Sequence, residues 1–360
     1  MKITFFIGSL IGGGAEHVTC NMANYLVESG YDVSILTMSE TDSYYLDSRV
    51  STTSLLKRSE LGNAFKSLMI RTKKLKSFLK SNDCDAYIVM LPITIILLLA
   101  FKRYISVPII ASERSFPSRN PKWIQCLLKK LARRASGWVF QTPEVLEWYK
   151  PYIGKASTVI IPNAIDKELP VREDSNELER TVVSVGRLHP AKRFDNLIRA
   201  FSTISPSYPE YKLVIYGEGG KRGELENLIE ELALNDRVKL PGFRTDVNKA
   251  IKNASLYVLS SDYEGMPNTL IEAMAMGLPC VATDCDGGAA RFLIKDGVNG
   301  LLVQKSNLVQ LAHAMSVVLN DPERAKSLGN EAKKIRERLS PDVVYNQWLT
   351  FLQSVTNTKL

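Results

Sequence analysis

The stretch 260–277 reads Ser260-Ser261-Asp262-Tyr263-Glu264-Gly265-Met266-Pro267-Asn268-Thr269-Leu270-Ile271-Glu272-Ala273-Met274-Ala275-Met276-Gly277 and indicates the fold of the chain. The apolar run 256–259 before it is typical of a buried strand. Pro267 suits the first turn of a helix, Gly277 suits a helix end, and 279–283 again has the composition of a strand. This order predicts a parallel α/β sheet in which the intervening loop lies at the carboxyl end of a strand, where open sheets bind ligands.

Two carboxylates are placed around the start of this helix. Glu264 lies in the loop, and Glu272 lies one turn beyond Asn268 and Thr269 on the same helical face. Free N–H groups and the dipole at a helix N-terminus favour anions and polar oxygens. The pattern therefore indicates a ligand site, with two solvent-exposed charges as the alternative.

The run from Glu264 to Glu272 resembles the Glu-Gly-x-Pro-x-x-x-x-Glu signature of retaining glycosyltransferases, family 4 in particular. The resemblance spans nearly the whole chain and is most specific over 182–303. It implies an α/β protein of GT-B architecture, with two Rossmann-like domains facing a central cleft. It also implies a nucleotide-sugar donor on the second domain and an acceptor on the first.

The resemblance and the composition together predict the domain boundaries. We expect an N-terminal acceptor-binding Rossmann-like domain over 1–165 and a nucleotide-sugar-binding Rossmann-like domain over 181–340. The stretch 166–180 is polar and charged, as is typical of a linker. The closing segment 341–360 resembles the helix that crosses back to the N-terminal domain in the family.

Two cations follow the predicted strand 181–185 at the start of the second domain. Arg187 and Lys192 lie at a strand exit beside a helix N-terminus, which suits a diphosphate. They match a Gly-Arg…Lys element of the family, whereas Arg193 is a weaker candidate. The resemblance therefore implies catalytic roles for Arg187, Lys192 and Glu264: the cations stabilise the departing nucleoside diphosphate, and the carboxylate holds sugar hydroxyls.

The donor site implied by the resemblance includes further residues from several loops. Glu272 is expected to hold the ribose hydroxyls, because a carboxylate accepts two such bonds. The other expected donor-binding residues are Gly13, Gly14, Gly217, Gly265, Met266, Pro267, Asn268 and Thr269.

The first domain begins as a Rossmann-type half but lacks a Gly-x-Gly-x-x-Gly motif, which argues against a dinucleotide cofactor. Its loop 13–16, Gly-Gly-Ala-Glu, resembles a family loop near the donor phosphates and the acceptor, so Glu16 is expected near the acceptor. Arg114 stands near the position where many family members have His. We assign it to the acceptor side, while the donor or Glu113 alone remain alternative partners.

The segment 61–80 has the period of an amphipathic helix. Lys66, Lys73 and Lys80 lie seven apart and form one stripe. This lysine stripe predicts contact with lipid headgroups or a polyprenyl diphosphate, and a solvated helix face is the alternative. The apolar residues expected on the opposite, docked side are Leu61, Ala64, Phe65, Leu68, Leu75 and Leu79.

Composition limits the remaining possibilities. The net charge of +8 favours anionic partners, an anionic membrane surface among them, but no nucleic-acid recognition motif is present. Five dispersed Cys suggest neither a disulfide framework nor a zinc site, and a reduced cytosolic setting fits. Asp284-x-Asp286 imitates a metal-binding pair but reads as a loop, so we expect neither a metal nor a cofactor.

The apolar run 91–101 is too short to span a bilayer, which takes about 20 residues, and it is expected to be a buried helix. The first seven residues have the pattern of a strand rather than of a signal peptide. The sequence therefore predicts a cytoplasmic protein, peripheral on the inner face of the cytoplasmic membrane.

These observations predict a retaining hexosyltransferase of bacterial surface polysaccharide or glycan biosynthesis. It would move a hexose or N-acetylhexosamine from a nucleotide sugar, with UDP as the expected nucleotide, to a saccharide acceptor. The acceptor is expected to be linked to a polyprenyl diphosphate, because the chain is similar to enzymes that extend such glycans. A nucleotide-sugar epimerase or hydrolase of the same architecture, an inactive membrane-associated scaffold and a basic nucleic-acid binder are the alternatives.

Overall fold

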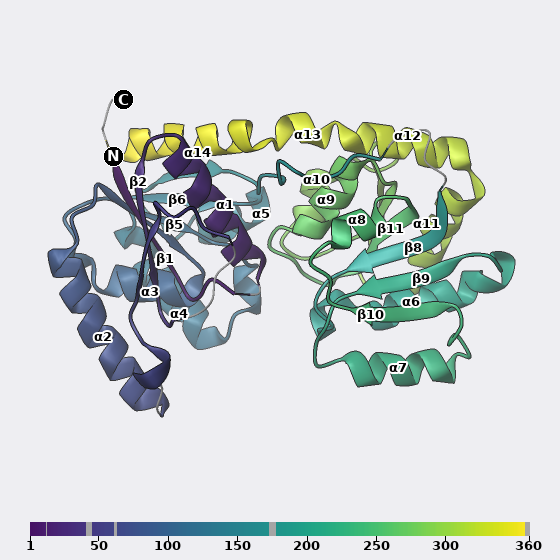
Figure 1. Ribbon diagram of the computed structural model, residues 1–360, viewed down its shortest axis with the longest axis horizontal. Helices are drawn as coiled ribbons and strands as arrows, with labels where there is room; N and C mark the ends of the chain where they lie inside the picture. Colours follow the sequence, from purple (N-terminus) through teal and green to yellow (C-terminus); the bar gives the residue numbers. More distant parts are fainter. Residues whose placement is uncertain (12, 41–44, 61–62, 173–177, 357–360) are drawn as a thin grey trace. The chain divides into compact units, whose positions relative to one another are not determined.

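The computed structural model describes residues 1–11, 13–40, 45–60, 63–172 and 178–356 of the chain (Figure 1). These residues form two compact units. The first comprises Met1–Ala164 together with the segment from Asp342 onward, and the second comprises Ile165–Pro341. Each unit is a parallel sheet with helices packed against it, as the order of strands and helices in the sequence predicts.

The first unit contains a seven-stranded sheet in the order β3-β2-β1-β4-β5-β6-β7, and every pairing in it is parallel. All its strands therefore end at one edge, which we call the carboxyl edge and which carries the loops with Gly13 and Arg114. Its strands are β1 (Lys2–Ile7), β2 (Asp32–Thr37), β3 (Ser51–Ser54), β4 (Ala86–Met90), β5 (Ile109–Ser112), β6 (Gly137–Phe140) and β7 (Ser157–Ile160).

Helices α2, α3 and α4 cover one face of this sheet (Figure 1). Leu75 of α2, Leu98 of α3 and Leu128 of α4 share one apolar core with Trp138 of β6. The helical segments of this unit are α1 (Gly14–Glu28), α2 (Ala64–Ser81), α3 (Pro92–Ala100), α4 (Lys122–Leu131), α5 (Pro143–Tyr149), α14 (Pro341–Thr356) and the short 3₁₀ turns η1 (Arg58–Glu60), η2 (Lys102–Tyr104), η3 (Pro117–Arg119) and η4 (Ala132–Arg134). The expectation of a buried helix within 91–101 is confirmed by α3.

Helix α2 differs in part from its prediction. Leu75 and Leu79 are buried as expected, but the expectation for Leu68 is wrong, since 49% of its surface is exposed. Leu61 lies outside the described residues. The side chains of Ala64 and Phe65 also lie outside the description, and Leu75 and Leu79 join the apolar core of this unit.

Helix α14 packs against the other face of the first unit, although it follows the whole second unit in the chain. Trp348 is 1% exposed, and the ring of Tyr345 lies 4.7 Å from that of Tyr25 in α1. A Cβ atom on Gly137 would lie 3.0 Å from the Phe351 ring, so this helix approaches the backbone of β6 closely.

The second unit contains a six-stranded parallel sheet in the order β10-β9-β8-β11-β12-β13. Its strands are β8 (Glu179–Val185), β9 (Lys212–Tyr216), β10 (Val238–Gly242), β11 (Ala254–Leu259), β12 (Cys280–Asp284) and β13 (Leu301–Gln304). Its helical segments are η5 (Pro190–Lys192), α6 (Phe194–Ile204), η6 (Ser205–Ser207), α7 (Arg222–Glu231), α8 (Val247–Ile251), α9 (Asn268–Met276), α10 (Ala289–Leu293), α11 (Leu308–Asn320), α12 (Pro322–Lys333) and α13 (Ile335–Arg338).

The strand–loop–helix–strand pattern from which the fold was deduced is present as β11, α9 and β12. The strands β8 and β11 are neighbours at the centre of the sheet, so the loops that follow them lie side by side at its carboxyl edge. Of the expected linker, residues 173–177 lie outside the described part of the chain, and β8 begins at Glu179. Among the described residues, no helix has the length and apolar character needed to cross a bilayer.

Candidate functional site

An ion pair joins the two loops that leave the central strands of the second unit. Lys192 Nζ lies 2.6 Å from Glu264 Oε1, and the same oxygen accepts a hydrogen bond of 2.6 Å from Ser261 Oγ. The two charged side chains are 21% and 12% exposed. Because both are largely removed from water, each charge is stabilised by the other.

Arg193 braces these same loops. It adopts the left-handed conformation (φ 48°), which is uncommon for a residue with a side chain. Its guanidinium contacts Asp195 at 3.1 Å, Asn196 at 2.8 Å, Asp262 at 3.2 Å and Ser306 at 3.3 Å. The contacts to Asp195 and Asp262 raise the pKa of Arg193, although burial opposes them.

The backbone reinforces the contact between the loops. Asp262 N donates to Ala191 O at 2.8 Å, and Ser260 Oγ donates to Lys192 O at 2.7 Å. Glu264 N donates to Asp286 O at 3.1 Å, which adds the loop after β12. Lys192 and Glu264 are therefore held by a network of loops at the carboxyl edge rather than by their own contact alone.

Helix α9 begins at Asn268, with Pro267 as its N-cap residue. The N-cap residue Pro267 makes no side-chain cap hydrogen bond, and the start of a helix is suited to ligand oxygens. Met266 is buried, and Thr269 Oγ1 is held by Tyr257 OH at 2.8 Å. Gly265 links this rigid turn to Glu264.

Glu272 is half-buried one turn into α9. Burial raises the pKa of this carboxyl to about 7, a hydrogen bond with Asn248 opposes the shift, and the charge of Asp166 adds to it. A carboxylate with a raised pKa gains from hydrogen-bond donors that favour its charged form. Ribose hydroxyls would be such donors.

Two glycines shape the loop that contains Arg187. Gly217 has φ 142°, and a Cβ atom there would lie 1.9 Å from the carbonyl oxygen of Gly186. Only glycine therefore fits at this approach between the ends of β8 and β9. Arg187 follows Gly186 directly and is exposed.

The acids of the Asp-x-Asp segment are each paired with a cation. Asp284 contacts Arg291 at 2.7 Å and Asp286 contacts Lys305 at 2.5 Å. Among the described residues, no group of three or more His, Cys, Asp or Glu side chains is arranged to hold a metal ion. These two carboxylates therefore act as loop anchors in this structure.

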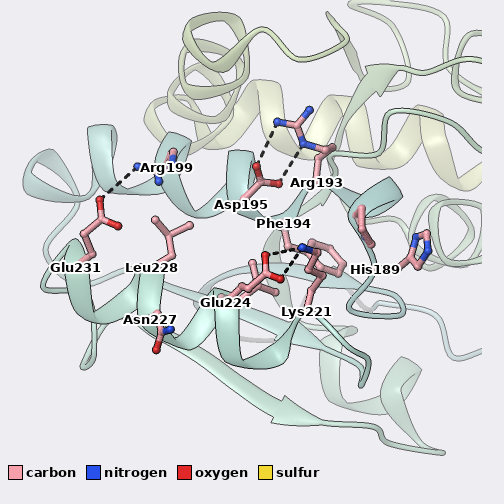
Figure 2. Close-up of a pocket in the computed structure, with 12 residues that line it drawn as sticks. His189, Arg193, Phe194, Asp195, Arg199, Lys221, Glu224, Asn227, Leu228 and Glu231 are labelled. Atoms are coloured by element: carbon pink, nitrogen blue, oxygen red, sulfur yellow. Dashed lines mark hydrogen bonds and ion pairs between the residues drawn. The ribbon is translucent and has the colours of Figure 1, made fainter.

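A cavity of about 420 Å³ lies between α6 and α7, beyond Arg193 (Figure 2). Each cation that lines it is paired with an acid: Arg193 with Asp195, Lys221 with Glu224 at 2.5 Å, and Arg199 with Glu231 at 3.8 Å. Lys192 and Glu264 are not among its lining residues. Because its charges are balanced, this cavity offers little attraction to a diphosphate.

In the first unit, Gly13 and Glu16 are in close contact at the start of α1. A Cβ atom on Gly13 would lie 2.0 Å from Glu16 Oε2, so the carboxylate occupies the space above the glycine. Gly14 is the first residue of α1 and is exposed. The absence of a side chain at Gly13 thus allows Glu16 to lie against the loop backbone.

Arg114 lies in a buried polar network behind the carboxyl edge. It is 8% exposed, its Nη1 donates to Asn163 Oδ1 at 2.6 Å, and its guanidinium lies 5.6 Å from the centre of the Trp348 ring. Its Nε and Nη2 atoms are enclosed without a hydrogen-bond partner among the described residues, and burial lowers the pKa of this group to about 10. Direct contact with a ligand would require these nitrogens to become accessible.

The Glu113 carboxylate is held by hydrogen bonds from groups other than the Arg114 guanidinium. Its carboxylate accepts bonds from Tyr149 OH at 2.7 Å and from Ser115 Oγ at 2.8 Å. Burial raises the pKa of Glu113, while these hydrogen bonds oppose that shift. The Ser-Glu-Arg segment therefore divides its charges between two buried networks.

The three lysines of the predicted stripe on α2 are all exposed. Lys80 Nζ lies 5.9 Å from the centre of the Tyr104 ring, whereas Lys73 and Lys66 lie one and two heptads earlier. Among their neighbours, Lys74 pairs with Glu60 at 2.7 Å and Arg71 donates to Met38 O.

Sequence reasoning missed Asp262, Ser261 and Trp348 and undervalued Arg193. Ser261 and Asp262 stand directly before Glu264 in the deduced stretch, so their polarity at a strand exit was an available signal. Trp348 is far from Arg114 in sequence, and no local pattern pairs them. Arg193 was undervalued because the sequence does not distinguish a cation that holds loops together from one that binds a ligand.

Two family models match the chain and together extend over 12–335. The model described as Glycosyltransferase Family 4 matches 12–169, and the model described as Glycosyl transferases group 1 matches 166–335.

Two curated relatives are similar over nearly their full length. One is an uncharacterised glycosyltransferase of Haemophilus influenzae, 28% identical over an alignment of 355 positions that covers 96% of this chain and 98% of the relative. Another, from Campylobacter jejuni, is a GalNAc-alpha-(1->4)-GalNAc-alpha-(1->3)-diNAcBac-PP-undecaprenol alpha-1,4-N-acetyl-D-galactosaminyltransferase. It is 29% identical over an alignment of 367 positions that covers 99% of each protein.

Solved structures share the fold. HepE of Anabaena in complex with UDP superposes with a TM-score of 0.82 at 21% identity, with 98% of this chain and 100% of that one covered. Sucrose-phosphate synthase of Thermosynechococcus elongatus gives a TM-score of 0.85 at 19% identity, with 99% and 100% covered. The expectation of a GT-B fold with two Rossmann-like domains is confirmed.

Proposed function

The chain is a glycosyltransferase of the GT-B type, built from a family 4 and a group 1 domain, and from this premise we propose its donor, acceptor and residue roles. The donor is a UDP-linked hexose or N-acetylhexosamine. The acceptor is a saccharide linked to a polyprenyl diphosphate in bacterial glycan biosynthesis, and transfer proceeds with retention. The Campylobacter relative, which by its name acts on an undecaprenol-linked glycan, and the UDP bound to HepE support these choices.

The contact between Lys192 and Glu264 carries the proposal for the second unit. It places a cation suited to a phosphate next to a carboxylate suited to sugar hydroxyls, at the carboxyl edge of a parallel sheet. Lys192 and Arg187 then stabilise the charge that grows on the departing diphosphate. Glu264 holds the hydroxyls of the transferred sugar.

The rest of the donor site follows from the elements around this pair. The start of α9, with Gly265 to Thr269, directs backbone N–H groups at donor oxygens. Glu272 accepts from the ribose hydroxyls, and Gly217 lets the loop of Arg187 approach the nucleotide. We also assign Gly13 and Gly14 to the donor.

The first unit provides the acceptor residues in this proposal. Glu16 faces the acceptor from the start of α1, and the lysine stripe of α2, Lys66 with Lys73 and Lys80, attracts its diphosphate or the membrane surface. Arg114 supports the acceptor side from within its buried network, where it positions Asn163 rather than offering open donors. The enzyme is proposed to work as a peripheral protein on the cytoplasmic face of the membrane.

A panel of UDP- and GDP-sugars tests the donor. We expect UDP-sugars to raise the unfolding temperature of the purified protein, because a ligand that binds only the folded state stabilises it. We then expect sugar transfer to a saccharide carried on a short prenyl diphosphate, with the anomeric configuration read by NMR.

Incubation with the donor alone separates the alternatives. Turnover of the donor without acceptor would contradict transfer and support an epimerase or hydrolase. We expect EDTA to leave transfer intact, because Arg187 and Lys192 supply the positive charge at the diphosphate and Asp284 and Asp286 are paired with cations. A strict need for a divalent metal would overturn this assignment.

A further inference from the structure

Three helices of the first unit end together, at the edge opposite to the carboxyl edge. Helix α2 precedes β4, α3 leads through η2 to β5, and α4 leads through η4 to β6. Because all strands of this sheet are parallel, the ends of these helices lie at the amino edge. The loops of Gly13 and Arg114 lie at the other end of the strands.

A cavity of about 480 Å³ lies at this amino edge and is lined by Ala100, Phe101, Lys102, Arg103, Tyr104 and Arg134. Cations surround the ring of Tyr104: Lys76 Nζ lies 5.2 Å from its centre, Lys80 Nζ 5.9 Å and Arg103 Cζ 4.8 Å. These distances are within the range of cation–π contacts. We call Lys76, Lys80, Arg103, Tyr104 and Arg134 the basic rim.

The basic rim carries positive charge without acidic partners. Its four cations are exposed, and within the described part of the chain none of them forms an ion pair with an acid. Burial raises the pKa of Tyr104, but the hydrogen bonds and charges of Lys76 and Arg103 together outweigh it, so that the pKa is lowered. Like charges gathered in this way repel each other unless an anion joins them.

The negative ends of the helix dipoles neutralise only part of this positive charge. Each helix C-terminus carries about −0.5 of an elementary charge, so three of them carry about −1.5. The four cations of the basic rim exceed that sum. Lys102 adds a fifth charge, whose ammonium group is held by the carbonyls of Ile105 and Val107 at 3.2 and 3.1 Å.

We propose that the basic rim binds the phosphate groups of anionic phospholipids and seats the first unit on a membrane surface. This inference rests on the proposed function, in which the acceptor is linked to a membrane lipid. The rim continues along the end of α4, where Lys130 and Arg133 are exposed and Lys129 lies 5.0 Å from the ring of Trp148. Such an open surface of cations and aromatic rings fits a lipid interface better than an enclosed small ligand.

The basic rim and the lysine stripe are two different surfaces. Only Lys80 belongs to both, whereas Lys66 and Lys73 lie nearer the start of α2. Replacing Lys76, Arg103 and Arg134 together therefore tests the basic rim without changing the stripe. The matched control removes three cations of the second unit, Lys212, Lys239 and Lys295.

Sedimentation with phosphatidylglycerol vesicles, with phosphatidylcholine vesicles as reference, measures the binding. We expect the wild-type protein and the control triple variant to bind only the anionic vesicles. Serine at the three rim positions should weaken binding by about 100-fold, since each cation near an anionic surface contributes a factor of about five. If the triple variant does not fold, the Lys76→Ser, Arg103→Ser double variant takes its place.

Equal binding by the rim and control variants, or equal binding of the wild type to neutral vesicles, would overturn the proposal. Calorimetric titration with inorganic pyrophosphate in the presence of saturating UDP forms the second arm. If pyrophosphate binds in a rim-dependent way and vesicles do not, a soluble phosphate compound is the ligand and the lipid assignment is wrong. UDP protection is measured on every variant, so a failure of donor binding is seen separately from a failure of the rim.

Discussion

Lys192 and Glu264 are 72 residues apart in sequence, and a distance of 2.6 Å separates Nζ of one from Oε1 of the other. In the proposed donor site each side chain would have to release the other to receive a ligand group. Binding of a phosphate by Lys192 has to leave Glu264 with a new donor, which a sugar hydroxyl supplies. Donor binding and rearrangement of this pair are therefore expected to be coupled.

Removing either member of the pair should have distinct effects. Lys192→Ala leaves the carboxylate with Ser261 Oγ, and we expect the free energy of unfolding to fall by ~2 kcal/mol and UDP binding to weaken. Glu264→Gln keeps the shape of the side chain and should preserve UDP binding while transfer falls by about 100-fold. Urea denaturation and initial rates measure the two effects. Near-normal transfer by Glu264→Gln would remove that residue from the catalytic set.

Glu272 makes stability depend on pH. The folded protein holds this proton with a pKa of about 7, against an ordinary value of 4.5. The folded state therefore binds more protons than the unfolded chain between these values, and the free energy of unfolding falls as the pH rises through them. Relative to Glu272→Gln, the wild type should lose ~3 kcal/mol between pH 4.5 and 8. Parallel pH profiles of the two proteins would argue against a raised pKa.

The same group should make UDP binding depend on pH in the opposite direction. Ribose hydroxyls donate to the ionised carboxylate, so affinity should rise by about tenfold from pH 6 to pH 8, as Glu272 loses its proton. Calorimetry on the wild type and on Glu272→Gln separates this effect from titration of the nucleotide phosphate, which is common to both. An identical pH dependence would mean that Glu272 does not contact the ribose.

Gly217 should tolerate no side chain. Gly217→Ala places a methyl group 1.9 Å from the Gly186 oxygen, and the backbone that carries Arg187 must move. We expect a loss of ~3 kcal/mol in the free energy of unfolding and weaker UDP binding. Gly220→Ala is the control, because no atom lies within 4 Å of the added methyl. Equal stability of the two variants would contradict the close approach.

Arg193 is expected to be a positioning residue. Arg193→Gly relieves the left-handed backbone conformation but removes the brace to Asp262 and Ser306. The two effects on stability oppose each other, so we expect a change within about 1 kcal/mol. The kcat should fall by about tenfold with little change in the KM of the donor, because Lys192 remains present but less well oriented. A large rise in KM with unchanged kcat would indicate direct donor contact instead.

The sequence predicted the sheet, the helix α9 and the strand exits because each depends on a local pattern. Leu256 to Leu259, Pro267 and Gly277 specify strand, turn and helix with little help from the rest of the chain. Parallel pairing then brings the loops after β8 and β11 together, so Lys192 and Glu264 could be placed at one edge from the sequence alone.

Contacts between distant residues were beyond such patterns. The exposure of Leu68 depends on where α2 leaves the core, which its amphipathic period does not specify. The enclosure of Arg114 depends on Trp348, more than 200 residues later. The gathering of Lys76, Arg103 and Arg134 depends on three helices that end at the same edge, whereas the spacing of lysines along one helix showed only the stripe.

Because α14 follows the second unit in the chain, the ribosome must translate all of Ile165–Pro341 before the first unit can be completed. The second unit is continuous in sequence and can fold as soon as it has emerged. Until then the nascent first unit lacks Trp348 over Arg114 and Phe351 against Gly137. The Arg114 guanidinium and the surface of β6 around Gly137, both covered in the folded unit, are then exposed to water. During synthesis it is therefore the earlier half of the chain that waits for the later half, and a chaperone that shields this surface would act at that stage.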